Sequence, residues 1–137
     1  MDIYDLDKSP IYTDDPEINR WIRDVFIECM GDDEYMLALD YNHSCYRYNP
    51  RITTPKANPT FMEDAKFSHG GYYAYFPEFY PKGDYFLFVA KDFSWGYFTH
   101  PWRNCAWVHG EPLMKKIQGI AGDIGFVKTT ENKVFGV

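Results

Sequence analysis

One tripeptide in this sequence, His100-Pro101-Trp102, joins two side chains that are suited to recognition or catalysis. Pro101 restricts His100 to extended backbone, which directs the imidazole and the indole at defined angles. This arrangement suits a corner that faces a ligand. The alternative is a structural corner, in which His100 binds a backbone carbonyl and Trp102 fills the end of the core.

A carboxylate and a second imidazole, Asp40 and His43, flank a predicted hairpin turn. A carboxylate beside an imidazole can tune a general base or hold a metal ion. More often, an aspartate at this position caps the turn by accepting hydrogen bonds from backbone amides. If the chain is an enzyme, the candidate catalytic residues are therefore His100, His43 and Asp40.

The sequence carries no motif that is specific for a metal or a cofactor. Asp40, His43, Asp84 and His100 lack the H-x-x-x-H and C-x-x-C spacings of strong metal sites, and Asp84 after Gly83 is typical of a turn. Glycine-rich phosphate loops, G-x-S-x-G elbows and catalytic-cysteine signatures are also missing from it. We therefore predict neither a metal nor a cofactor.

The stretch from Tyr72 to Tyr80 is rich in aromatic residues and prolines. Large rings in an irregular segment are typical of recognition surfaces, although a lid over the core has the same composition. The predicted binding residues come from this stretch and from the motifs around it: Tyr72, Tyr73, Tyr75, Phe79, Tyr80, Trp102, Asp84 and Arg47.

Composition limits the classes of function. The chain has 137 residues and a net charge of −6, and this acidic balance argues against binding to nucleic acids or anionic membranes. An acidic start at Met1–Asp5 argues against a signal peptide. Cys29, Cys45 and Cys105 are few and widely spaced, which predicts packed, reduced thiols and a cytoplasmic location.

Hydrophobic periodicity predicts one α+β domain with a mainly antiparallel sheet of about five or six strands. An amphipathic helix packs on one face of this sheet, and a short helix follows near the C-terminus. The predicted segments are an acidic arm over 1–13, a helix over 14–30 that ends at Gly31, an aromatic strand meander over 35–110 with a loop at 51–71, a short helix over 111–119, and an irregular tail or edge strand over 120–137.

Four sequence blocks carry a resemblance to a known family: Leu39-Asp40-Tyr41-Asn42-His43 followed by Tyr46-Arg47-Tyr48-Asn49-Pro50; Pro81-Lys82-Gly83-Asp84-Tyr85-Phe86-Leu87-Phe88; Gly96-Tyr97-Phe98-Thr99-His100-Pro101-Trp102; and Gly110-Glu111-Pro112-Leu113. In order and approximate spacing they resemble the bacterial domain of unknown function 2716. Two departures are Tyr41, where the family has Trp, and Thr99, where it commonly has Gly. The resemblance brings no established activity, and it implies, through the family's gene neighbourhoods, immunity proteins that act against secreted toxins.

The sequence therefore favours a non-enzymatic protein-binding module over an enzyme. In this hypothesis an acidic, Tyr-rich face docks on a protein partner, such as a cognate toxin that the chain inhibits. The second hypothesis is a small-molecule-binding protein or a hydrolytic enzyme that holds His100, His43 and Asp40 in one pocket. Convergence of these side chains in a cleft favours the enzyme, and their dispersal favours the binder.

Overall fold

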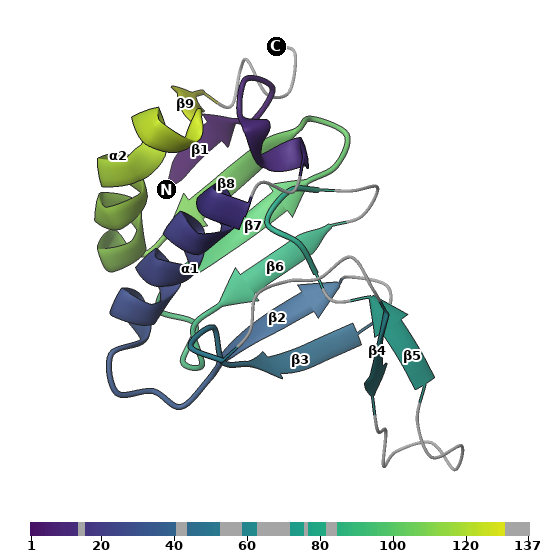
Figure 1. Cartoon of the computed structure of the whole chain (residues 1–137). Coiled ribbons are helices and arrows are strands. Elements are labelled where there is room, and N and C mark those ends of the chain that lie inside the picture. Colours follow the sequence, from purple (N-terminus) through teal and green to yellow (C-terminus); the bar gives the residue numbers. More distant parts are fainter. Residues whose placement is uncertain are drawn as a thin grey trace.

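A seven-stranded antiparallel sheet with two helices on one face forms the body of the molecule (Figure 1). The computed structural model describes residues 1–13, 16–40, 44–52, 59–62, 72–75, 77–81 and 85–130. The strand order is β3-β2-β6-β7-β8-β1-β9. The elements are β1 (Asp2–Asp5), η1 (Pro10–Thr13), α1 (Pro16–Met30), β2 (Met36–Asp40), β3 (Ser44–Tyr48), β4 (Pro59–Met62), β5 (Tyr72–Tyr75), β6 (Phe86–Val89), β7 (Gly96–His100), β8 (Cys105–His109), α2 (Glu111–Ile124) and β9 (Val127–Thr129). The predicted α+β class is confirmed.

Helix α1 packs on the sheet through one apolar stripe, as its periodicity predicts. Ile18, Ile22, Phe26 and Met30 are buried, and Gly31 ends the helix with a φ of 56°. The Arg51 guanidinium adds hydrogen bonds to the backbone oxygens of residues 31 and 33, at 2.7 and 3.0 Å. A cation at this end of a helix also complements the helix dipole.

The core between helix and sheet is largely aromatic. Phe26 lies 5.5 Å from Phe79, 5.7 Å from Phe88 and 5.8 Å from Trp95, measured between ring centroids. Tyr97 is completely buried beside them, and its hydroxyl donates a hydrogen bond to the backbone oxygen of Phe79. A buried phenol needs such a partner, and this one fastens the segment 77–81 to the sheet.

The prediction of an acidic arm over 1–13 is wrong. Residues 2–5 form β1, which pairs with β8 on one side and with β9 on the other. Tyr4, Leu6 and Ile11 are buried in the main core, and Asp2 is a buried carboxylate that binds Lys128 at 3.2 Å. The few isolated apolar residues of this segment are core residues because strand pairing places them against the helices.

The C-terminal elements are also longer than predicted. Helix α2 continues to Ile124, because its buried stripe of Leu113, Ile117 and Ile124 extends past Gly119, and Gly125 ends it with a φ of 72°. Residues 127–129 then form the edge strand β9, which was one of the two alternatives for the tail. Strand β4 lies within the predicted loop 51–71 and pairs with β5 in a separate two-stranded sheet.

The three cysteines are free, but they are not equally packed. Cys105 is buried and Cys29 is half-buried, whereas Cys45 is exposed, so the prediction of packing is wrong for this thiol. Within the described part of the chain, no helix is long and apolar enough to span a membrane.

Candidate functional site

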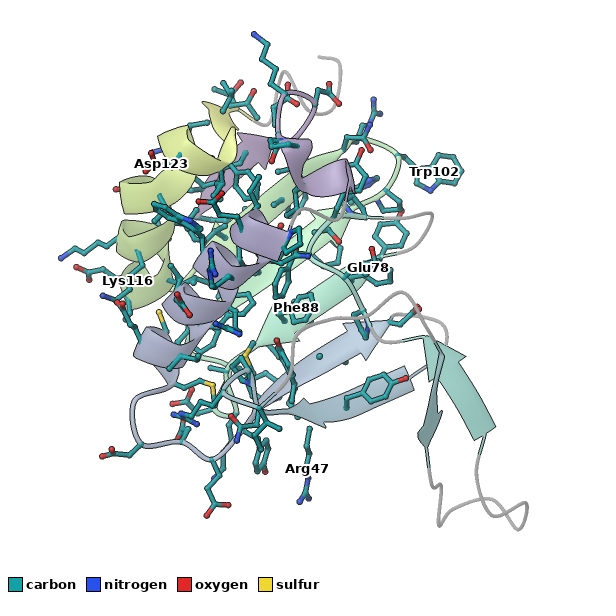
Figure 2. The ribbon with its side chains drawn as sticks, in the orientation of Figure 1. Arg47, Glu78, Phe88, Trp102, Lys116 and Asp123 are labelled. Atoms are coloured by element: carbon teal, nitrogen blue, oxygen red, sulfur yellow. The ribbon has the colours of Figure 1, made fainter. Side chains whose placement is uncertain are left out.

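The candidate site is the corner between β7 and β8, which holds the His100-Pro101-Trp102 motif. Strand β7 ends at His100, the chain turns through residues 101–104, and His100 pairs with Cys105 as β8 begins. Trp102 is 82% exposed and projects away from the sheet at this turn, as Figure 2 shows. The alternative in which Trp102 fills the end of the core is therefore wrong, and the exposure of Trp102 agrees with a corner that faces a ligand.

Hydrogen bonds connect the residues of this corner to one another and to the N-terminal segment. The backbone N–H of Trp102 donates to Nδ1 of His100 at 3.3 Å. Asn104 takes a left-handed conformation, with a φ of 47°, that asparagine tolerates better than most residues. Its carbonyl oxygen accepts from the N–H of Leu6 at 2.9 Å, and its side-chain amide donates to Asp7 at 3.3 Å. The N-terminal segment therefore fixes the turn that presents Trp102.

Two clefts share Trp102 and Arg103 as lining residues. The first has a volume of about 490 Å³ and is completed by Tyr85 and His100. The second has a volume of about 320 Å³ and is lined, besides Trp102 and Arg103, by Asp5, Asp7, Asn104, Cys105 and Thr129. Arg103 and Trp102 are both exposed, and both line the two clefts.

The surroundings of the His100 imidazole favour its neutral form. Burial and, second, the charge of Arg103 lower the pKa of His100 below its ordinary value of 6.5. Because Nδ1 accepts the Trp102 amide, the single proton of the neutral ring lies on Nε2. The Tyr85 ring packs edge-on against this imidazole, with 5.0 Å between centroids. His100 therefore offers a donor, and not a base, to a ligand in the first cleft.

The structure does not bring Asp40 and His100 together. Asp40 is 8% exposed and follows Met36 and Ala38 on the face of the sheet that the helices cover. Asp40 pairs with Phe86 and Phe86 pairs with Thr99, so two strand spacings, roughly 10 Å, separate Asp40 from β7. His100 follows Thr99 and therefore points to the opposite face. His43, the third candidate catalytic residue, lies outside the described residues, as does Asp84.

The predicted binding residues divide into different environments. The prediction of Phe79 as a binding residue is wrong, because Phe79 is 1% exposed and belongs to the core. There its carbonyl oxygen accepts a hydrogen bond from the Tyr97 hydroxyl. Tyr80 is half-buried and packs against the same core. Tyr72, Tyr73 and Tyr75 lie on β5, within the predicted strand meander over 35–110, and only their backbone is described. Arg47 is exposed on β3, which is distant from the corner in the sequence.

Sequence reasoning missed Arg103, Tyr85 and the acidic side chains of the second cleft. Arg103 directly follows the motif, so its position alone was a usable signal. No signal in the sequence pointed to Asp5 and Asp7, because only the pairing of β1 with β8 brings them to the corner. No group of three or more metal-binding side chains occurs within the ranges that the structure describes.

Comparison with known proteins agrees with the motifs that surround this corner. Residues 3–114 match the family described as "Protein of unknown function (DUF2716)". The chain belongs to this family. The match begins in β1 and ends in the first turn of α2, so the family includes the N-terminal strand that fastens the corner.

One curated protein is similar to part of the chain. The "Uncharacterized protein YxiI" of Bacillus subtilis (strain 168) is 32% identical over 88 residues, which are 64% of this chain and 46% of that protein. The chain thus spans about half the length of this curated relative. No solved structure matches the fold significantly.

Proposed function

We propose that this DUF2716 protein is a non-enzymatic protein-binding module whose corner, from His100 to Arg103, contacts the partner. One observation carries the proposal: Trp102 is 82% exposed on a turn that side-chain and backbone hydrogen bonds hold in place. Exposing an indole to water is unfavourable, and burying it on a partner recovers that free energy.

Residue types at the corner support this function. Tryptophan and arginine are enriched among the few residues that dominate binding energy at protein interfaces. A turn that is already fixed loses little conformational entropy when it binds. The two clefts beside Trp102 and Arg103 provide concave surface for side chains of the partner.

The enzymatic alternative has less support. Asp40 and His100 lie on opposite faces of the sheet, so they do not form an acid–base pair. Nδ1 of His100 already accepts the Trp102 amide, so Nε2 carries the proton, which suits recognition of an acceptor group better than proton abstraction.

We extend the proposal to an immunity-type inhibitor that acts in the cytoplasm on a toxin. The resemblance to the family supports the extension, and the net charge of −6 suits attraction to a basic protein. This extension is independent of the corner, since a binding module with another partner would use the same surface.

A pull-down with matched variants tests the binding function. The tagged chain is expressed in the organism that encodes it, cross-linked, purified and analysed by mass spectrometry. The double variant Trp102→Ala/Arg103→Ala should lose at least about 90% of a partner that the wild type retains, because a tenfold loss needs only about 1.4 kcal/mol. The control variant Phe93→Ala removes another exposed aromatic ring, which is 67% exposed and lies at the opposite end of β7. This variant should retain the partner.

Two outcomes would contradict these proposals. If no protein co-purifies, or if the double variant retains it fully, the corner is not a protein-binding site. If the partner is captured but the chain protects no cell against the co-expressed toxin encoded beside it, the immunity role fails and the binding function stands.

A further inference from the structure

The second face of the main sheet carries a row of apolar side chains. Every described helix packs on the first face, where Tyr4, Met36, Phe88 and Tyr97 join the main core. The alternation of the strands therefore directs the remaining residues to the other side. We call this side the second face; its members include Ile3, Tyr35, Leu37, Leu39, Cys45, Arg47, Tyr85, Leu87, Val89, Phe98, His100, Cys105 and Trp107.

The apolar side chains of the second face are only partly covered. Ile3, Val89 and Cys105 are buried by their neighbours, but Leu37, Leu39, Leu87, Phe98 and Trp107 are each half-buried. Phe98 stacks on Tyr85 at 5.8 Å and meets the edge of Trp107 at 5.9 Å. These contacts form a continuous aromatic row across β6, β7 and β8 that begins beside His100.

Two cations mark the opposite end of this face. The Arg47 guanidinium carbon lies 5.1 Å from the centroid of the Tyr35 ring, and the Lys91 ammonium lies 5.2 Å from the same centroid. The two cations are therefore within about 10 Å of each other. Both residues are exposed, and no acidic side chain described in the structure lies within 4 Å of either charge.

Arg47 and Lys91 lie in a chain with a net charge of −6, in which only some of the described cations form ion pairs. Four of the described cations, Arg23, Lys115, Lys116 and Lys128, form ion pairs with aspartate or glutamate. Arg47 and Lys91 instead share one aromatic ring, which orders them without neutralising them. They are available to a carboxylate from another molecule.

We propose that the second face docks a segment of the protein partner that places apolar side chains on Leu39, Leu87 and Phe98 and a carboxylate between Arg47 and Lys91. The inference rests on the proposed function and deepens it. The corner and the second face then form one continuous interface, since Tyr85 and His100 belong to both. A protein fits this surface because the apolar row and the localised pair of cations require both kinds of group on one ligand.

An acidic group at this end is compatible with a partner that is basic as a whole. Net charge determines long-range attraction, whereas close charge pairs determine orientation within the complex. A carboxylate that meets Arg47 and Lys91 would fix the direction in which the segment crosses the sheet.

Site-specific photo-cross-linking tests where the partner lies. The photoreactive amino acid p-benzoyl-phenylalanine replaces Cys45, which is exposed on the second face, and in a control chain it replaces Arg20 on the outer surface of α1. Irradiation in the organism that encodes the chain should join position 45, and not position 20, to the protein that the corner retains in the pull-down.

Other cross-linking results separate the two proposals. If position 45 joins a second copy of this chain, a lipid or nothing, while the corner still retains its partner, this inference is overturned and the proposed function stands. If neither experiment captures a protein, the proposed function fails as well.

Charge reversal then tests the carboxylate. The double variant Arg47→Glu/Lys91→Glu should raise the Kd of the purified, cross-linked partner at least about tenfold in titration calorimetry. Lys8→Glu/Arg20→Glu changes the net charge equally, at exposed positions away from the second face, and should change Kd less than about twofold. Circular dichroism checks that both variants fold.

The calorimetric outcomes are decisive in either direction. A Kd that is unchanged by Arg47→Glu/Lys91→Glu, or that is raised equally by both double variants, overturns the inference. Selective weakening supports it, and reversal of one acidic residue of the partner to lysine should then restore binding to the Arg47→Glu/Lys91→Glu variant.

Discussion

At the scale of single residues, the charge state of His100 depends on its neighbours and gives a direct prediction. Burial and the Arg103 charge both disfavour the imidazolium, so the pKa of His100 in the native protein lies below 6.5. Arg103→Gln removes the second cause and should raise this pKa towards its ordinary value. NMR titration of the imidazole resonances measures the shift, and Arg20→Gln on α1 should leave the pKa unchanged.

The same shift makes stability depend on pH. A histidine with a lowered native pKa binds more protons when unfolded, so its contribution is complete above about pH 6.5 and is lost as the pH falls through the native pKa. A His100→Gln variant should therefore lose less stability than the wild type between pH 7 and pH 5. An equal loss in both proteins would show that His100 titrates normally.

Two glycines beside and within α2 should respond oppositely to alanine. Gly110 has a φ of 86°, and a Cβ there would lie 2.4 Å from the Ser94 carbonyl oxygen and 2.6 Å from the Trp95 Cα. Gly110→Ala should lower the free energy of unfolding by about 2 kcal/mol or more, from strain and overlap. Gly119 has open space around it and helical neighbours, so Gly119→Ala should raise stability by about 0.5–1 kcal/mol. Urea denaturation measures both, and destabilisation by Gly119→Ala would contradict this account.

At the scale of elements, β1 is an interior strand of the sheet, between β8 and the edge strand β9. Deletion of residues 1–5 would expose the edges of β8 and β9 and remove the buried Ile3 and Tyr4. We expect the truncated chain to lose cooperative thermal unfolding, because at least two large core side chains and two strand pairings disappear together. A truncated chain that still melts cooperatively near the wild-type temperature would show that β1 is dispensable.

Sequence patterns predicted those elements that are long or locally paired. Helix α1 has a clear apolar period, and β6, β7 and β8 form hairpins with short connections, so neighbouring residues specify them. Strand β1 could not be predicted in the same way, because its four residues pair with residues of β8 that lie 100 or more positions away. In α2, Gly119 resembled a stop signal, but burial of Ile124 outweighs the small cost of an exposed helical glycine.

At the scale of the whole molecule, the candidate site was only partly predictable. Local sequence identified the His-Pro-Trp corner, because its three residues are consecutive and the proline restricts the backbone of the histidine before it. The acidic wall of the second cleft and the cation pair around Tyr35 arise from strand order, which brings Asp5 to Cys105 and places β2 between β3 and β6. To predict that Asp40 and His100 lie apart also requires the strand registers. Alternation along a strand assigns a residue to a face of the sheet only once the paired residues are known.

The Phe26 ring connects α1 to both β6 and β7 and to the segment 77–81, so its removal tests whether the molecule folds as one unit. Its centroid lies 5.5–6.0 Å from four buried aromatic rings, and Phe26→Ala should lower the free energy of unfolding by about 3–5 kcal/mol. Domains of this size have only about 5–15 kcal/mol in total. Trp21→Ala, on the same helix but 37% exposed, should cost about 1 kcal/mol or less. In urea, tryptophan fluorescence and far-UV circular dichroism should shift together in Phe26→Ala, because one core supports both layers. If helix signal were lost before fluorescence, α1 would unfold independently of the sheet that presents the corner and the second face.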